Sequence, residues 1–320
     1  MVPGGGTGGV DDKVMSAGET RFALKVDVDT HEGLARGVPT IADVLARRDL
    51  RASFFVVCGP DRMGRRLVRL LNPRFVAKLA RTHVVATYGW RTLLSGSLLP
   101  ARAVASAFPA TLRALVAAGH EIAVHGYDHA RWQDRLPRLS AAQVEAEVRR
   151  ATATFRDVLG APPRGFAAPG WRCTAASLEA VDAAGFEYRS DTRGTHPYIP
   201  AAAGRVFRTP ELPTTLPTLD EVYGLPARRP ADLAEQYVKL VRNGALNVHT
   251  IHAELEGRAH RDVLEALLDR LQGTARFVRL CDEAQALAGG RLPVCTMREG
   301  RLPGRPLPVA LQQEEIPRNA

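Results

Sequence analysis

The sequence predicts an α/β fold, a distorted (β/α)7-type barrel with a basic helical insert after its second strand. Short apolar segments with strand character alternate with longer amphipathic segments, and this alternation is typical of a parallel sheet. About seven such units fall within roughly 270 residues, which favours a closed or nearly closed barrel over an open sheet. Ionisable residues also follow the ends of several predicted strands.

Each predicted element is assigned from its hydrophobic pattern and its flanking residues. The predicted strands are 22–28, 52–57, 121–125, 165–168, 188–190, 247–252 and 276–279. The predicted helices are 37–48, 105–118, 140–158, 175–184, 230–242 and 260–272. Helices separate successive strands, so the strands are expected to run parallel.

The chain divides into one large domain and two terminal extensions. Residues 1–19 are rich in glycine and are expected to be disordered, with Met1 or Met15 as the true start. Residues 20–290 form the predicted barrel domain. Residues 291–320 are rich in proline and arginine and are expected to lie over the surface as a tail.

The sequence favours a cytoplasmic protein. It contains no apolar run of about 18 residues, which a membrane-spanning helix would need, and no recognisable export leader. The four cysteines form no CxxC pair and are expected to be reduced thiols: Cys58, Cys173, Cys281 and Cys295.

Positive charge is concentrated in one part of the chain. The net charge is +9, yet no Asp or Glu occurs from Arg62 to His120, a segment with ten basic residues. The rest of the chain holds 33 basic and 34 acidic residues and is nearly neutral. This segment is therefore expected to meet an anionic partner, such as phospholipid headgroups, a phosphorylated substrate or nucleic acid.

Residues 62–102 are predicted to form a basic amphipathic helical insert, broken at Pro73, that rests on an anionic membrane. The alternative is a helical pair that covers the barrel and exposes its arginines to water. Tyr88 and Trp90 are candidates for the membrane interface and for substrate binding, or they pack inside the insert. Nucleic acid is the weakest partner because no helix-turn-helix, zinc-finger or RNA-binding signature is present.

Seven ionisable side chains lie at or just after five predicted strand ends, namely Asp27, Asp29, His125, His129, Arg172, Asp191 and His252. The carboxyl ends of barrel strands open on one face, where active sites form. These groups are therefore expected to converge on a single pocket.

The HxxxH pair of His125 and His129 would place two imidazoles on one side of a helical turn. Together with one carboxylate they would make a three-ligand metal site that leaves positions open for water. Asp27 and Asp29 point to the same side of a strand, so either one can be the ligand while the other serves as a base. Taken alone, the pair or the DxD could also be accidental.

Five motifs resemble those of the NodB-type polysaccharide deacetylases: Asp27-Val-Asp29, His125-xxx-His129, Pro169-Gly-Trp171-Arg172, Ser190-Asp191 and Ile251-His252. Longer stretches, including VDVDT, TLPTLDEV and TIHAELEG, resemble a narrower branch of that family, the deformylases of an undecaprenyl phosphate-linked formamido sugar. The likeness covers about residues 22–285. The glycine-rich N-terminus and the tail depart from it and are expected not to touch the motif residues.

The resemblance implies that Asp29, His125 and His129 hold a divalent ion, with Zn²⁺, Mn²⁺, Co²⁺ and Fe²⁺ all admissible. It implies the NodB form of the distorted barrel as well.

The resemblance also implies the acid–base groups. Asp27 would be the general base, held by Arg172, and His252 the general acid, with Asp191 beside it. Trp171 would form an apolar wall for the sugar, or belong to the core.

Three further polar residues of this region are expected to be mainly structural. His249 is read as a structural histidine, with the pocket wall as the alternative. Glu254 and Glu256 are read as loop structure.

The implied reaction removes the formyl group of undecaprenyl phosphate-linked 4-deoxy-4-formamido-L-arabinose, giving the amino sugar lipid and formate. It would serve lipid A modification and resistance to polymyxin and other cationic peptides, at the cytoplasmic face of the inner membrane. The alternatives are another NodB-type deacetylase of an N-acetylated saccharide and a non-catalytic sugar- or lipid-binding barrel.

Overall fold

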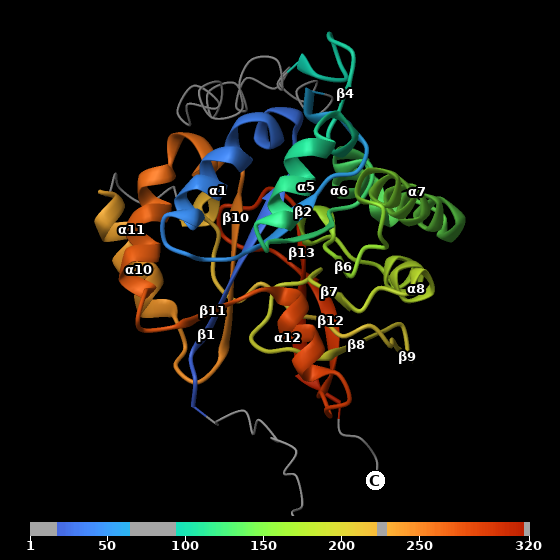
Figure 1. Cartoon of the computed structure of the whole chain (residues 1–320). Coiled ribbons are helices and arrows are strands. Elements are labelled where there is room, and N and C mark those ends of the chain that lie inside the picture. The colour runs from blue at the N-terminus through green and yellow to red at the C-terminus, as the bar shows by residue number, and fades with distance from the viewer. Residues whose placement is uncertain (1–17, 65–93, 223–228, 317–320) are drawn as a thin grey trace, which may run out of the picture.

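A computed structural model of the chain describes residues 18–64, 94–222 and 229–316 (Figure 1). The predicted candidates Tyr88 and Trp90 and nearly all of the predicted N-terminal extension lie outside the described residues, as does most of the predicted insert. Within the described ranges, no helix combines the length and the hydrophobicity needed to cross a membrane.

A parallel sheet of seven strands forms the centre of the molecule, in the order β10-β1-β2-β5-β6-β7, with β11 paired to β1. Its strands are β1 (Arg21–Val28), β2 (Ser53–Val56), β5 (Glu121–Val124), β6 (Gly165–Phe166), β7 (Tyr188–Arg189), β10 (Leu246–His252) and β11 (Arg276–Val278). All seven predicted strands are present, and their ends differ from the prediction by at most two residues.

The six predicted helices are also present and lie on the outside of the sheet (Figure 1). They are α1 (Val38–Ala46), α5 (Pro109–Ala117), α7 (Ala141–Leu159), α8 (Ala175–Ala184), α10 (Pro230–Leu240) and α11 (Arg261–Leu271). Among the described residues, three helices were not predicted: α6 (His129–Arg135), α9 (Leu219–Val222) and α12 (Leu280–Leu287). The same part of the chain also contains single turns: η1 (Gly33–Gly37), η3 (Ala105–Ala107), η4 (Leu136–Arg138), η5 (Pro169–Trp171) and η6 (Leu255–Ala259).

An irregular segment, residues 210–216, bridges β7 and β10 and so closes the barrel. On one side, the backbone N–H of Leu212 donates to the carbonyl of Arg189, at 2.8 Å. On the other side, the N–H groups of Thr215 and Leu216 donate to the carbonyl of Val248, at 3.0 and 3.2 Å. The expected distorted barrel is therefore confirmed, and its distortion lies where a regular strand is missing.

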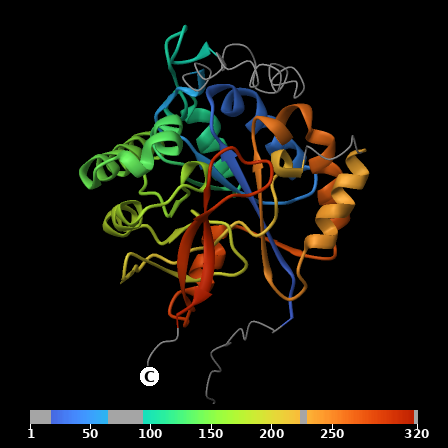
Figure 2. The same ribbon diagram turned by 180° about the vertical axis from the view of Figure 1, so that it is seen from behind.

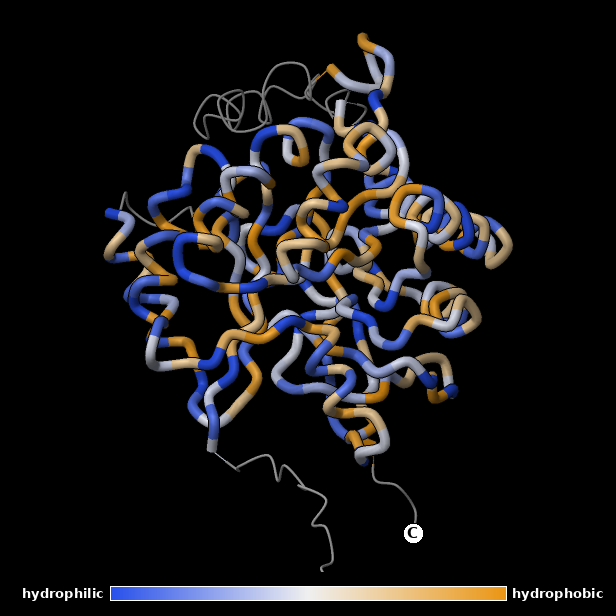
Figure 3. Tube along the Cα trace, in the orientation of Figure 1, coloured by the Kyte–Doolittle hydropathy of each residue, from blue (hydrophilic) through white to orange (hydrophobic). Residues whose placement is uncertain are grey.

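Side chains alternate along β1 between two environments. Phe22, Leu24 and Val26 join the large apolar cluster under the outer helices. Ala23 points into the barrel and joins a smaller cluster that includes Leu280 of α12. This cluster fills the amino end of the barrel, so polar residues are left to line the carboxyl end. The hydropathy-coloured trace shows apolar and polar residues interspersed along the elements (Figure 3).

The C-terminal segment forms a hairpin of β12 (Val294–Gly300) and β13 (Val309–Glu315), seen crossing the back of the molecule in Figure 2. It joins a second sheet of order β13-β12-β8-β9, where β8 is Ile199–Ala202 and β9 is Arg205–Val206. The segment predicted to be a surface tail is therefore part of a regular sheet, although most of the hairpin's residues remain at least partly exposed. Few apolar residues mark the hairpin, because only a narrow face that includes Val309 and Ala310 is buried.

A short two-stranded ribbon lies at the base of the basic segment. It pairs β3 (Pro60–Asp61) with β4 (Arg102–Ala103) in antiparallel register. The ribbon brings the two ends of the predicted insert together above the barrel (Figure 1).

Candidate active site

Five of the seven predicted side chains line one cavity of about 200 Å³ at the carboxyl ends of the strands. Its walls are Asp27, Asp29, Met63, His125, His129, Gln133, Gly170, Trp171, Asp220, His252, Leu255, Arg305 and Pro306. Arg172 and Asp191 do not line it. The predicted convergence on one pocket is thus correct for the two histidines, the two aspartates of β1 and His252.

Asp27 and Asp29 are placed by β1 and its end. Asp27 lies inside the barrel directly opposite His252 in the parallel register of β1 and β10. Asp29 follows the strand, and its backbone N–H donates to Glu254 Oε1 at 3.1 Å, as does the N–H of Thr30 at 2.9 Å. The buried Glu254 therefore fixes the backbone of this turn, in agreement with its expected structural role.

His125 and His129 reach the cavity from a strand-to-helix turn and not from one helical turn as predicted. His125 follows β5, and Gly126 then reverses the chain with φ +70°, a conformation that side chains other than glycine rarely adopt. The side chain of Asp128 accepts a hydrogen bond from the N–H of Arg131 and so caps α6, in which His129 is the first residue. The HxxxH spacing correctly indicated that the two imidazoles meet in the cavity, although they do not lie on one helical turn as was assumed.

The side chains of Asp29, His125 and His129 form the one group of three potential metal ligands found among the described residues. His125 Nε2 lies 3.3 Å from Asp29 Oδ1, and His129 Nε2 lies 3.3 Å from Asp29 Oδ2. Ligand atoms around one tetrahedral ion, at bond lengths near 2.0–2.2 Å, would be separated by roughly 3.3–3.6 Å. These spacings fit a divalent ion.

The hydrogen bonding of His125 supports the same fit. Its Nδ1 lies 3.0 Å from the carbonyl oxygen of Ala167, which can only accept, so Nδ1 carries the proton. With Nδ1 engaged in this way, Nε2 is the nitrogen that faces the carboxylate of Asp29, as in a histidine that ligates a metal. Burial raises the pKa of Asp29, but His129 and His125 outweigh it and hold the pKa well below its usual range.

The cation beside Asp27 is Lys25 and not Arg172 as predicted. Lys25 Nζ lies 3.6 Å from Asp27 Oδ1 and donates to the carbonyl of Ser190 at 3.1 Å. Arg172 Nη1 instead donates to the carbonyl of Pro308 at 3.0 Å, in the C-terminal hairpin. Since side chains alternate along a strand, Lys25 shares the inward face with Asp27, a signal that was present in the sequence.

The predicted partner of His252 is also corrected, because Asp191 lies elsewhere. Asp191 Oδ1 accepts from the N–H of Ala168 at 2.7 Å, and burial raises its pKa to about 6. Burial alone would lower the pKa of His252, but Asp220 of α9, followed by Asp29 and Asp27, raises it above its ordinary value. Asp220 lies within the TLPTLDEV stretch. The sequence alone did not show which residue of this stretch lies beside His252.

Trp171 forms one wall of the cavity. Its backbone has φ +52°, which is unusual for a bulky residue, and its indole N–H donates to Thr214 Oγ1 at 3.1 Å. The ring centroid lies 6.4 Å from that of His252, in an edge-on arrangement. Trp171 is thus buried and also lines the pocket, so the two alternatives for this residue do not exclude each other.

His249 lies on the outer face of β10, three positions before His252 and so on the opposite side of the strand. Its ring packs 4.5 Å from the ring of Tyr237, and burial lowers its pKa to about 3. The structural interpretation of His249 is confirmed.

A barrel with two histidines and two aspartates at the carboxyl ends of its strands is suited to metal-assisted hydrolysis, and the comparison with known proteins gives its family. A family model described as "Polysaccharide deacetylase" matches residues 18–189. The chain belongs to this family.

Two curated relatives bear the name "Probable 4-deoxy-4-formamido-L-arabinose-phosphoundecaprenol deformylase ArnD". The protein of Shewanella sediminis (strain HAW-EB3) is 37% identical over 249 residues, covering 78% of this chain and 80% of that protein. The protein of Wigglesworthia glossinidia brevipalpis is 28% identical over 291 residues, covering 89% of this chain and 99% of that protein. Within its family, the chain therefore groups with these deformylases.

Solved structures with low sequence identity share the fold. A crystal structure assigned to a polysaccharide deacetylase of Mycobacterium smegmatis has a TM-score of 0.62 at 18% identity, covering 90% of this chain and 96% of that chain. The structure of Puue allantoinase has a TM-score of 0.58 at 18% identity, covering 87% and 93%. The NodB form of the barrel is thereby confirmed.

The three-ligand arrangement predicts that His129→Ala weakens the binding of Zn²⁺ or Co²⁺ by more than about 100-fold, since even an outer-shell partner is worth 10- to 100-fold. Metal content per chain and the dissociation constant, measured by competition with a chelating dye, check this. His196→Ala, which alters an exposed histidine, is the matched control. Equal affinity in the two variants would contradict the assignment.

Proposed function

We propose that this protein hydrolyses the formamide of undecaprenyl phosphate-linked 4-deoxy-4-formamido-L-arabinose, releasing formate and the 4-amino sugar lipid. The single observation that carries the proposal is the placement of a carboxylate, Asp27, and an imidazole, His252, on adjacent strands beside a three-ligand cluster. The identity of the substrate is inferred from the names of the two deformylase relatives. The product would then serve lipid A modification, as the resemblance implies.

Asp27 is suited to take a proton. Its Oδ1 accepts no hydrogen bond from any of the described residues, and Lys25 Nζ holds it from 3.6 Å away. As water adds to the formyl carbon, one of its protons passes to this carboxylate. The position of Asp27 beside the metal ligands supports this role, because its Oδ2 lies 3.8 Å from His125 Nε2.

His252 is suited to supply a proton. With its pKa raised by the surrounding carboxylates, His252 keeps its imidazolium form to a higher pH than a free imidazole does. When the bond between the formyl carbon and the sugar nitrogen breaks, His252 protonates the departing amine. The proton that Asp27 takes from water compensates for the proton that His252 gives to the amine. One water and one formamide therefore give formate and one amine.

The metal would be held by Asp29, His125 and His129, as their donor atoms fit. When bound, such an ion supplies Lewis-acid polarisation of the formyl carbonyl and acidification of water. Which of the admissible divalent ions is used is a question of availability.

The basic insert begins at the rim of this cavity. Met63 lines the cavity, and the N–H of Gly64 donates to the carbonyl of Ser95 at 3.0 Å, so both ends of the insert meet there. Leu98 and Leu99 protrude beyond them, 81% and 36% exposed. This loop is the apolar tip near β4 in Figures 1 and 3.

We propose that this surface docks on an anionic bilayer at the cytoplasmic side of the inner membrane. Two exposed leucines beside a segment with ten basic and no acidic residues suit the interface of a membrane with anionic lipids. A sugar carried on an undecaprenyl chain would then enter the cavity from the membrane side.

Asp27→Asn and His252→Ala are expected to lower formate release from the purified formylated sugar lipid by about 10²- to 10⁴-fold, because each removes one proton-transfer group. Mass spectrometry of the lipid, for the loss of one CO unit with and without a chelator, checks the reaction. Bound metal should be unchanged in both variants, which separates catalysis from metal binding.

Wild-type activity in both variants would leave only a binding role for the barrel. Release of acetate but not formate, from paired N-acetyl and N-formyl substrates, would point instead to a deacetylase of another saccharide.

Lys25→Met is expected to lower kcat by about tenfold or more, because it leaves the base without its cation in a buried site. Arg172→Gln is the matched control and should change kcat by less than about threefold, since its partners are Pro308 and Glu299. Steady-state formate release at 25 °C, with melting curves for both variants, checks this. A larger loss in Arg172→Gln would restore Arg172 as the partner of Asp27.

Membrane docking predicts that the protein floats with vesicles rich in phosphatidylglycerol at low salt and less at high salt. The double change Leu98→Glu and Leu99→Glu should lower the bound fraction by about tenfold or more, because two apolar side chains are lost from the interface. Val206→Glu, at an exposed apolar position on β9, is the control. A wild-type protein that fails to float at low salt removes docking.

A further inference from the structure

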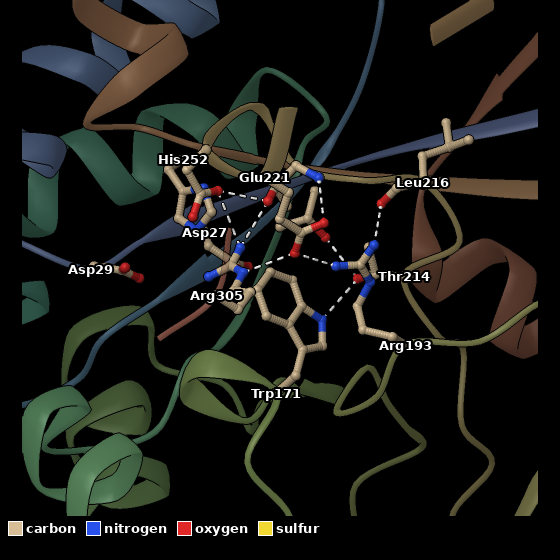
Figure 4. Close-up of polar contacts among 12 residues, drawn as sticks. Asp27, Asp29, Trp171, Arg193, Thr214, Leu216, Glu221, His252 and Arg305 are labelled. Atoms are coloured by element: carbon tan, nitrogen blue, oxygen red, sulfur yellow. Dashed lines mark hydrogen bonds and ion pairs between the residues drawn. The ribbon is translucent and has the colours of Figure 1, made fainter. Parts of the chain in front are cut away.

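The C-terminal hairpin delivers an arginine to the active site. Arg305 lies in the turn between β12 and β13, and its side chain lines the cavity next to Pro306. Its guanidinium carbon sits 4.5 Å from the centre of the Trp171 ring, which is the geometry of a cation–π contact. Figure 4 shows Arg305 between Trp171 and His252.

The same guanidinium binds the short helix α9. Arg305 Nε donates to Glu221 Oε1 at 2.8 Å, and Nη2 donates to Asp220 Oδ1 at 3.1 Å and to Thr218 Oγ1 at 2.8 Å. Arg193 approaches Glu221 Oε1 from the other side, at 2.5 Å. Two arginines and two carboxylates thus balance in charge beside His252.

The backbone of the turn is built to reach α9. Gly304 has φ +80°, and a Cβ added there would lie 3.0 Å from the Cα of Glu221 and 3.3 Å from the carbonyl oxygen of Asp220. Only glycine therefore allows this approach. The first residues of β13, just after the turn, are held as well, because the N–H of Arg193 donates to the carbonyl of Ala310 at 2.9 Å.

We propose that Arg305 is a positioning residue, which locks the Trp171 wall and the Asp220 carboxylate in place around His252. This inference rests on the proposed deformylase function for its kinetic part only. Both carboxylates of α9 already form ion pairs with the guanidinium of Arg305. Its positive charge is therefore neutralised within the protein and does not serve to bind an anionic substrate. The C-terminal hairpin is accordingly part of the active site.

Two readouts test this role in the full-length chain. The first is ¹⁹F NMR of protein labelled with 5-fluorotryptophan, in which Trp171→Phe identifies the Trp171 signal among the three tryptophans. Arg305→Ala and Gly304→Ala are expected to shift or broaden that signal, and guanidinium ion at non-denaturing concentration should restore it in Arg305→Ala. Arg305→Lys should give an intermediate signal, because it keeps the charge and loses the fork.

The second readout is the kinetics of formate release. In Arg305→Ala, kcat should fall by about tenfold or more while KM stays within about threefold, and guanidinium should recover part of the loss. Arg301→Ala, an exposed arginine of the same turn, is the matched control and should behave as wild type in both assays.

An unchanged Trp171 signal in Arg305→Ala overturns the proposal. So does a rise in KM at constant kcat, which would assign Arg305 to substrate binding. If wild-type protein releases no formate, the proposed function fails, while the fluorine signal still decides the position of Trp171. Melting curves of Arg305→Lys distinguish a local effect from loss of folding.

Discussion

The parallel pairing of β1 with β10 is the constraint on which the site depends. In this register Asp27 faces His252, and the alternation of side chains points both into the barrel. A slip of one residue in either strand would turn that strand's own group, Asp27 or His252, outward to the apolar layer beneath the helices. The register is fixed because the outward set of β1, with Phe22 and Leu24 among it, is fully buried.

Buried carboxylates provide the second level of order, because they hold the backbone at the strand ends. Glu254 accepts from the N–H groups of Asp29 and Thr30, and Glu211 accepts in the same way from Asp191 and Thr192. Burial raises the pKa of Glu254 and of Glu211 to about 8. The backbone N–H groups of these loops have no partner in a strand or helix. Because they are buried away from water, the carboxyl groups of Glu254 and Glu211 accept their hydrogen bonds instead.

The second, smaller sheet brings the C-terminal part of the chain into contact with the residues around the active site. Through Pro308 it binds Arg172, and through Arg305 it binds α9 and Trp171. The expectation that the tail does not touch the motif residues is therefore wrong. Two groups that a motif search would treat as independent, Trp171 and His252, share their surroundings through this hairpin.

The sequence by itself determined the strands and helices of the barrel and the two histidines of the metal cluster, and the resemblance to the family chose Asp29 over Asp27 as the third ligand. Local periodicity identifies strands and helices, and Asp29, His125 and His129 follow predicted strands that share one open end. Only the tertiary structure decided the partners of the acid and the base. Asp220 and Arg305 reach His252 from distant parts of the chain through long-range packing, which leaves no local pattern, whereas Lys25 lies two residues before Asp27 on the same strand.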